Sequence, residues 1–289
     1  MIPAAFEYHA PTTLRQALNI LRRYPGETKV LAGGQSLLPV MRMRLSQPSH
    51  VVDLGGIPGL TSIEERDGGL AIGPMTTYFM LESSPLVQKH AQALAEASSQ
   101  VADLQVRNRG TLGGSIAHAD PAADLTAVAL ALDSRIRTTG AGRAKSIPVE
   151  RFFVDVFTTA LGDTELIREI FIPFPAPGTG SAYQKFANKA SHFASVGVAA
   201  LVTLDNQGLC RKVRIGVTGA GATPVRARAS ERYLTGKQPT AGNLKAAGQR
   251  ASNGIEFLED IHGSVGYRGQ LTRVMAERAL ERAVIRAQP

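Results

Sequence analysis

The chain contains a single cysteine, Cys210, among its 289 residues. An intrachain disulfide needs two cysteines and an iron–sulfur cluster normally takes four, so this chain can form neither by itself. The sequence also has no apolar run of the about 18 residues that a membrane-spanning helix requires. Residues 1–7 have no basic start and no long apolar stretch. We therefore expect no signal peptide and a cytoplasmic location.

Several motifs for catalysis and nucleotide binding are also missing. The chain has no H-E-x-x-H, no C-x-x-C, no G-x-S-x-G and no G-x-x-x-x-G-K-[ST]. Its 6 histidines are scattered without ligand spacing, so no metal ligand is assigned. None of the Gly-x-Gly triplets follows a predicted strand and continues to a third glycine. A nucleophile elbow, a P-loop and a Rossmann-type site are therefore disfavoured.

What is present indicates a folded chain with an uneven charge. Hydrophobic residues make up 44% and charged residues 19%, which excludes a disordered, collagen-like or coiled-coil chain. The net charge is 32 − 24 = +8, and residues 201–289 contribute 14 − 7 = +7 of it. A basic C-terminal third could meet nucleic acid, an anionic cofactor or an acidic partner. Because it has no interleaved aromatic residues, we interpret it as a solvated basic helix face.

The hydrophobic pattern alternates between short and long periodic runs, which predicts an α+β protein. One helix is expected over residues 85–101. Strands are expected over residues 29–32, 49–54, 70–73, 135–138, 165–172, 195–204 and 211–218. The Pro- and Gly-rich stretch 173–180 fixes the backbone and breaks the periodicity. It therefore predicts a domain boundary, with a separate α+β unit beyond it.

Two glycine pairs are the strongest local signals. Gly33-Gly34 follows a predicted strand and precedes a helix, and Gly113-Gly114 follows Arg109 in a turn-rich passage. Glycine lets the backbone approach a ligand closely, and successive N–H groups in such turns form an anion site. One such loop is more often a structural turn. Two of them, about 80 residues apart, suit a ligand with two phosphates, so a dinucleotide site and two structural turns remain equal alternatives.

Two aspartates follow the second glycine pair. Asp120 and Asp124 could each cap the helix predicted from Ala122. We assign that structural role to Asp120. For Asp124, the resemblance described next favours acceptance of hydrogen bonds from sugar or ribityl hydroxyl groups.

At these residues the chain resembles a known family. Segments 29–39, 111–124, 221–227 and 260–268 closely resemble the FAD-binding medium subunit of carbon monoxide dehydrogenase-like molybdenum hydroxylases, which is also the central domain of xanthine dehydrogenase. The resemblance covers nearly the whole chain. It implies an FAD-binding fold of the vanillyl-alcohol-oxidase (PCMH) type, made of two α/β subdomains over residues 1–56 and 57–175. A C-terminal α+β domain over residues 176–289 is expected to follow.

The resemblance also implies which residues bind FAD. The first glycine loop is expected to wrap the pyrophosphate, and the second loop with Asp124 to hold the other side. Lys185 is expected near the flavin and Phe193 over its ring. The complete set is Lys29, Val30, Leu31, Ala32, Gly33, Gly34, Gln35, Ser36, Leu37, Thr111, Gly113, Gly114, Ser115, Asp124, Lys185 and Phe193. No residue is assigned as a catalytic acid or base.

Two positions depart from the family pattern. Gln35 stands where many relatives have His, and either side chain can form hydrogen bonds. His192 stands where relatives often have Asp. An acidic group near the flavin affects its potential and the approach of an acceptor, so this change leaves the acceptor (oxygen, NAD, a quinone or a cytochrome) open.

The implied role is electron transfer. A large subunit would carry a molybdenum–pterin centre, a small subunit would carry two [2Fe–2S] clusters, and FAD on this chain would pass electrons to an external acceptor. Two copies of each subunit would form a heterohexamer. Having one cysteine excludes the variant of this subunit with its own [4Fe–4S] cluster. The alternatives are a free-standing FAD-dependent oxidase or dehydrogenase, and a basic nucleic-acid-binding protein. The substrate of the complex stays open.

Overall fold

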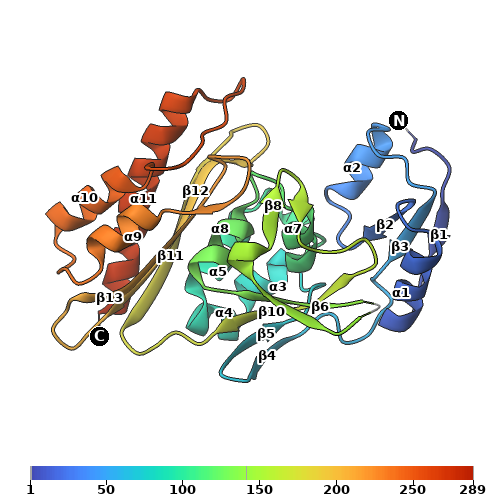
Figure 1. Cartoon of the computed structure of the whole chain (residues 1–289), viewed down its shortest axis with the longest axis horizontal. Coiled ribbons are helices and arrows are strands. Elements are labelled where there is room, and N and C mark those ends of the chain that lie inside the picture. Colours follow the sequence, from blue (N-terminus) through green and yellow to red (C-terminus); the bar gives the residue numbers. More distant parts are fainter. Residues whose placement is uncertain (1, 141, 289) are drawn as a thin grey trace.

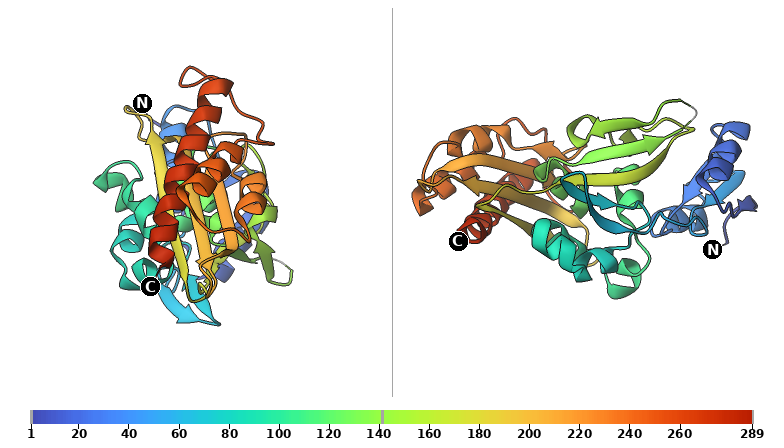
Figure 2. Two further views of the ribbon diagram at one scale, coloured as in Figure 1. Left: turned by 90° about the vertical axis from the view of Figure 1, so that its left-hand side faces the viewer. Right: turned by 90° about the horizontal axis from the view of Figure 1, so that it is seen from below.

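The computed structural model describes residues 2–140 and 142–288. The three larger sheets follow one another in chain order along the long axis of the molecule, and helices pack against each of them (Figure 1). The views in Figure 2 show the first sheet and the last helices at opposite ends. Within the described residues, no helix combines the length and the apolar character needed to cross a membrane.

The N-terminal unit is a parallel sheet of three strands in the order β1-β3-β2. Its strands are β1 (Glu7–His9), β2 (Thr28–Leu31) and β3 (His50–Asp53). Parallel neighbours need crossover connections, which α1 (Leu14–Arg23) and α2 (Leu37–Arg42) supply. Thr13 caps α1, and the helix buries its apolar stripe against Val52 of the central strand.

The middle unit is an antiparallel sheet in the order β4-β5-β10-β6-β7. Its strands are β4 (Ile63–Arg66), β5 (Gly69–Ile72), β6 (Arg135–Thr139), β7 (Lys145–Pro148) and β10 (Leu166–Pro173). Its helices are α3 (Tyr78–Ser83), α4 (Pro85–His90), α5 (Gln92–Ser99), α6 (Leu104–Arg107), α7 (Leu112–His118) and α8 (Asp124–Ala131). The 3₁₀ turn η1 (Val149–Arg151) leads to a small hairpin of β8 (Phe153–Asp155) and β9 (Thr158–Thr159).

The single helix expected over residues 85–101 is wrong, because the chain forms two helices there. Ala91 has φ −144° and ψ 53°, outside the helical region, and its N–H closes α4 on Val87 at 2.8 Å. Its side chain is fully buried. Val101 lies beyond the end of α5. Hydrophobic periodicity is averaged over a window, so it does not detect one residue that changes the direction of the chain.

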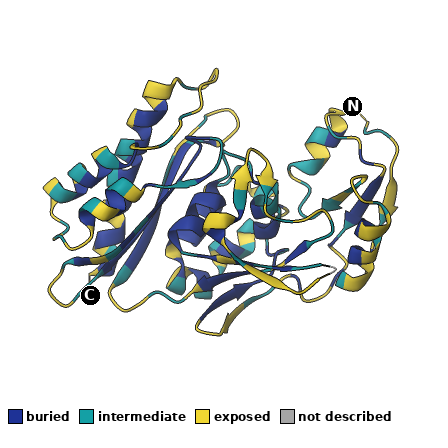
Figure 3. Ribbon diagram, viewed as in Figure 1, coloured by how far each residue is buried: buried dark blue, intermediate teal, exposed yellow. Residues whose placement is uncertain are grey.

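The C-terminal unit is an antiparallel sheet covered on both faces. Its strands are β11 (Thr179–Ala187), β12 (Ala194–Leu204), β13 (Cys210–Thr218) and β14 (Val225–Arg226), and its helices are α9 (Arg228–Leu234), α10 (Ala241–Arg250) and α11 (Val265–Ala287). Helix α11 packs on β11 and β12, while α5 and α8 of the middle unit contact the same sheet. A β-carbon on Gly216 would lie 2.0 Å from the carbonyl oxygen of Ala127, so glycine lets α8 approach the sheet. Burial is therefore continuous between the two units (Figure 3).

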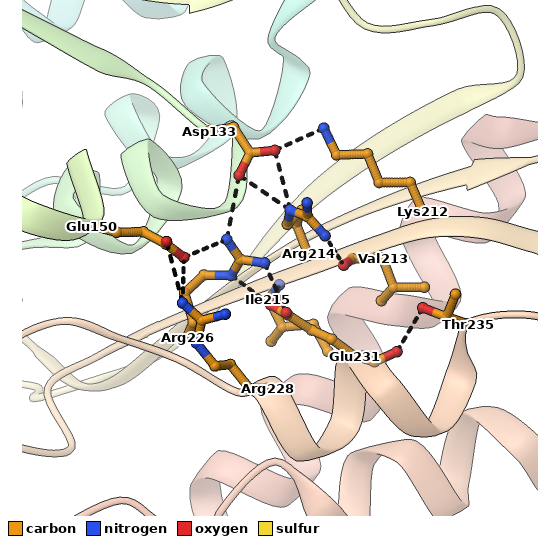
Figure 4. A network of polar contacts seen from close by, with 10 residues as sticks. All are labelled: Asp133, Glu150, Lys212, Val213, Arg214, Ile215, Arg226, Arg228, Glu231 and Thr235. Atoms are coloured by element: carbon orange, nitrogen blue, oxygen red, sulfur yellow. Dashed lines mark hydrogen bonds and ion pairs between the residues drawn. The ribbon is translucent and has the colours of Figure 1, made fainter. Parts of the chain in front are cut away.

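Charged pairs also join these two units. Asp133 and Glu150 of the middle unit pair with Arg214, Arg226 and Arg228 of the C-terminal unit (Figure 4). Arg226 is buried and contacts both carboxylates as well as Glu231. Further along, Glu96 accepts from Arg282 and Arg286. The expected solvated basic face is therefore wrong for Arg226, whose side chain is buried among carboxylates, whereas Arg228 and Arg282 pair with carboxylates and stay largely exposed.

Candidate functional site

The two glycine loops meet although they are distant in sequence. A β-carbon on Gly33 would lie 2.1 Å from the carbonyl oxygen of Arg109 and 2.8 Å from the Cα of Gly110. On the other loop, a β-carbon on Gly114 would lie 3.5 Å from that of Ala32. Real β-carbons do not approach a backbone oxygen this closely. The contact between the N-terminal and middle units therefore requires glycine at position 33.

The first loop presents a row of free backbone donors. Within residues 2–140 and 142–288, the N–H groups of Gly33, Gly34, Gln35, Ser36 and Leu37 donate to no protein acceptor. The first bond of the α2 turn runs from Leu38 N to Gly34 O at 3.1 Å. Gly34 has φ +77°, a left-handed conformation that favours glycine and makes the row concave.

The Ser36 hydroxyl adds a further donor to this row. Ser36 occupies the N-cap position of α2, but its side chain makes no capping hydrogen bond. Capping serines normally accept from the first turn, as Ser84 does from Val87 N on α4. The first loop is consequently a cradle of backbone N–H groups and one hydroxyl, which suits a phosphate-bearing ligand.

The second loop uses its donors inside the protein. Leu112 N bonds to Thr76 O at 3.0 Å, Gly113 N to Pro74 O at 2.8 Å, and Gly114 N to the Thr111 hydroxyl at 3.1 Å. A β-carbon on Gly113 would lie 2.4 Å from the β-carbon of Pro74. The two glycine pairs therefore differ in role: the first offers free donors, and the second packs closely beneath it.

The segment around Tyr78, which supports the second loop, was not predicted from the sequence. Tyr78 N donates to Gly110 O at 3.0 Å, and the Tyr78 ring lies where a β-carbon on Gly110 would be. Burial raises the pKa of the Tyr78 hydroxyl to about 12, while Ser115 lowers it and Asp124 raises it. The hydroxyl thus stays protonated at neutral pH. The one available signal was Thr77, whose side chain caps α3.

Lys29 and His118 lie at the edge of the two loops, and only Lys29 carries a positive charge there. Lys29 is exposed on β2, and His118 ends α7. Burial lowers the pKa of His118; Asp120 raises it and the positive charge of Lys29 lowers it further. Asp120 accepts from Ala122 N at 2.8 Å within a turn, but α8 begins only at Asp124 with Ala123 at its N-cap, so the expected helix-capping role of Asp120 is wrong. The histidine is therefore neutral at pH 7, and the positive charge at this edge comes from Lys29.

Asp124 and Lys185 form a buried ion pair. Lys185 Nζ lies 3.0 Å from a carboxylate oxygen of Asp124, and the Tyr183 hydroxyl donates to the other oxygen at 2.6 Å. The side chains of Lys185 and Asp124 are 2% and 5% exposed. Burial raises the pKa of Asp124, while Lys185 and Tyr183 lower it. The structure thus brings these two predicted residues together, and each satisfies the other's charge.

Phe193 lies apart from this pair, on the loop between β11 and β12. Its ring is 48% exposed. The Asn188 side chain accepts from Ala190 N at 2.9 Å and from Ser191 N at 3.2 Å, so the loop is internally braced. His192 has φ 59°, a left-handed conformation unusual for a non-glycine residue. The loop lies at the upper end of strands β11 and β12 (Figure 1).

The fold and the site define a class of protein. Residues 4–175 match the family described as the FAD binding domain in molybdopterin dehydrogenase, and residues 181–283 match the CO dehydrogenase flavoprotein C-terminal domain. The chain belongs to the FAD-binding medium subunits of the molybdenum hydroxylases, and it is a flavoprotein oxidoreductase subunit. The mixed helix and strand fold expected from the sequence is confirmed.

Individual relatives match over nearly their full length. The carbon monoxide dehydrogenase medium chain of Hydrogenophaga pseudoflava is 38% identical over 98% of both chains. The 6-hydroxypseudooxynicotine dehydrogenase complex subunit alpha of Paenarthrobacter nicotinovorans is 37% identical over 100% of this chain and 98% of its own. A solved carbon monoxide dehydrogenase from Hydrogenophaga pseudoflava matches with TM-score 0.95 and 39% identity over 99% of each chain.

The residues present fit FAD, the cofactor of this family. The free N–H groups of residues 33–37 are the donors that a pyrophosphate takes at such loops. Gly33 and Gly34 leave no side chain over that row. Lys29 supplies a positive charge at the edge.

Proposed function

We propose that this chain is the electron-transfer subunit of a molybdenum hydroxylase, binding FAD on the cradle of residues 33–37. The observation that carries the proposal is that row of backbone N–H groups with no protein acceptor. Unpaired donors clustered on a loop at a helix start favour an anionic ligand. When bound, FAD supplies a carrier that accepts electrons from one centre and passes them to another.

Each part of the site then has a task. Gly33 to Leu37 and the Ser36 hydroxyl hold the pyrophosphate, and Lys29 complements its charge. The second loop holds the first loop in position because it packs against residues 74–78. Its residues are Thr111, Gly113, Gly114 and Ser115. The buried pair of Asp124 and Lys185 fixes α8 to β11, and lone pairs on Asp124 remain for ligand hydroxyl groups. Phe193, exposed on its loop, covers the flavin ring.

The electrons come from another chain. Cys210 is fully buried, and burial raises its pKa to about 11, so its thiol is neither a cluster ligand nor a redox group. We infer a small subunit with two [2Fe–2S] clusters and a large subunit with a molybdenum–pterin centre. Two copies of each of the three subunits form a cytoplasmic heterohexamer that reduces an external acceptor.

The test measures the cofactor and its reduction separately. The purified full chain should show the absorption of oxidised flavin, and acid should release FAD. The dithionite-reduced small subunit, mixed anaerobically with the chain, should bleach the flavin within seconds. Substrates of the family should not bleach it when this chain is alone. Reduction by substrate without partners would establish a free-standing oxidase, and a colourless folded chain that takes up no FAD would overturn the proposal. Nucleic-acid binding that weakens steeply with salt would then become the leading explanation.

A further inference from the structure

Three titratable side chains meet on the N-terminal sheet, away from the glycine loops. Glu7, His9 and His50 each offer one ligand atom, and these atoms all lie within 4.8 Å of one another. Glu7 and His50 are paired residues on the parallel strands β1 and β3. His9 lies two residues after Glu7, so its side chain points to the same face of the sheet. The pairing of β1 with β3 therefore brings together His9 and His50, which are 41 residues apart in the sequence.

The separations of the ligand atoms match those around a four-coordinate metal. His9 Nε2 lies 3.1 Å from His50 Nδ1, and the Glu7 carboxylate oxygen lies 3.4 Å from His50 Nδ1 and 3.8 Å from His9 Nε2. Ligands about 2.0–2.1 Å from a tetrahedral zinc ion lie about 3.3 Å from each other. All three separations are within about 0.5 Å of that value, so one cation could contact all three atoms.

The two imidazoles also have their ring nitrogens turned toward each other. Without a cation, one nitrogen must carry a proton and donate to the other, because two lone pairs repel. A metal ion accepts both lone pairs after the proton moves to the opposite ring nitrogen. Tyr24 stacks on His50 with ring centroids 3.7 Å apart, which holds that ring in place. The guanidinium of Arg23 lies over the other ring of this stack, that of Tyr24, at 5.3 Å from its centroid.

We propose that Glu7, His9 and His50 form a binding site for a divalent cation of the zinc class. Two imidazoles and one carboxylate are the nitrogen and oxygen donors that Zn²⁺ prefers, with water in the fourth position. The Glu7 side chain is 69% exposed, so the ion can enter and keep that water. Bound there, the ion ties β1 to β3.

The site is separate from the FAD cradle. His50 begins β3 and pairs with Thr28, the first residue of β2. The cradle follows Leu31, the last residue of that strand. Zinc binding at this site can therefore be tested independently of the electron-transfer function, and retained FAD binding shows that a variant is folded.

The experiment uses the full chain, stripped with EDTA and dialysed into a buffer without phosphate. Zinc chloride titrated by calorimetry at pH 7.5 should bind with one equivalent per chain. Cobalt chloride should give the intense visible bands of tetrahedral coordination, which a surface carboxylate would not produce. His9→Gln should weaken zinc binding at least 100-fold, because losing a residue that merely orients a metal ligand already costs about 10–100-fold. Glu7→Gln should weaken it less.

His90→Gln is the matched control. His90 also pairs with a carboxylate, Glu65, at 2.7 Å, but no second histidine belongs to that pair. This variant should bind zinc like the wild type, and every variant should keep its FAD. Glu7 is exposed and His9 is half-buried, so substitutions there should leave a folded chain even where His50→Gln does not. Absence of stoichiometric zinc binding by the wild type, or equal binding by His9→Gln, would overturn the proposal.

Discussion

The carbonyl oxygen of Arg109 occupies the space where a side chain on Gly33 would begin: a β-carbon there would lie 2.1 Å from it. Because that atom belongs to backbone, a larger residue cannot be accommodated by rotating a side chain. Gly33→Ala should push the two loops apart, at a cost of about 1–3 kcal/mol, which is typical of overpacking. The same movement displaces the free N–H row. We therefore expect FAD affinity to fall roughly 10-fold or more.

This prediction is checked by titrating the apoprotein with FAD and following flavin fluorescence, and by urea unfolding. Gly242→Ala is the matched control, because nothing lies within 4 Å of a β-carbon on that residue. It lies in α10, where alanine favours the helix. Gly33→Ala with unchanged affinity would show that the loops do not have to be in contact for binding.

Ser36 and Ser84 separate ligand binding from helix capping. The Ser36 side chain caps nothing, whereas Ser84 accepts from Val87 N. Ser36→Ala should weaken FAD binding about 10- to 150-fold, as for a hydrogen bond to a charged group, and leave apoprotein stability within about 0.5 kcal/mol. Ser84→Ala should do the reverse, lowering stability by about 1 kcal/mol. FAD titration measures the affinity of both variants, and urea unfolding measures their stability. A stability loss in Ser36→Ala with normal affinity would assign that hydroxyl a structural role.

Lys185 tests the buried ion pair. Lys185→Met leaves the Asp124 carboxylate buried with the Tyr183 hydroxyl as its remaining partner, which should cost about 3–5 kcal/mol. Adding Asp124→Asn removes the uncompensated charge and should restore most of that loss. Lys145→Met is the control, because that lysine pairs with Glu165 but is 55% exposed, so the loss should stay below about 1 kcal/mol. Urea unfolding of the four chains gives the comparison. Equal losses for both lysines would contradict a buried pair.

The surroundings of Asp124 show which parts of the site could be predicted from the sequence and which could not. The glycine pairs and Asp124 were identifiable because the family pattern is local and unbroken. The partners of Asp124 were not, because Tyr183 is 59 residues away and only the packing of α8 against the C-terminal sheet brings it near. Strand β11 itself is not predicted, since Thr179–Ala187 contains few β-branched or large apolar residues. The individual FAD contacts and the domain boundaries remain predictions.

The prediction of a solvated basic face from net charge was also limited, because it too depends on contacts between residues far apart in the sequence. The +7 of residues 201–289 is real, but a net charge does not say which groups meet. Glu150 and Asp133 precede Arg226 by 76 and 93 residues, and only the docking of the two units pairs them. Sequence patterns report local structure, whereas these ion pairs depend on tertiary contacts.

Arg226 tests that docking. Its buried guanidinium contacts Asp133, Glu150 and Glu231. Asp133 and Glu150 keep Arg214 and Arg228 in Arg226→Met, but the buried Glu231 loses the cation it pairs with, which should cost about 3–5 kcal/mol. Among the residues that the structure describes, Arg228 pairs only with Glu150, and its side chain is 60% exposed, so Arg228→Met should cost below about 1 kcal/mol. Differential scanning calorimetry of both variants is the measurement. If the two substitutions were equivalent, the network would not hold the units together.

Cys210 predicts a loss of stability in alkaline solution. Burial, with a smaller contribution from Asp205, raises the pKa of its thiol from 9.0 to about 11. A thiol ionises more readily when unfolded, so the folded state is favoured fully below pH 9 and loses this contribution as the pH rises toward 11. The loss should amount to about 1–3 kcal/mol, because each pKa unit is worth about 1.4 kcal/mol.

Urea unfolding at pH 8 and pH 10.5 should show a steeper alkaline decline in the wild type than in Cys210→Ala. The native thiol should also react with an aromatic disulfide reagent far more slowly than the unfolded one. Parallel declines in the two chains, or rapid modification of the native protein, would mean that Cys210 is accessible to solvent and ionises freely.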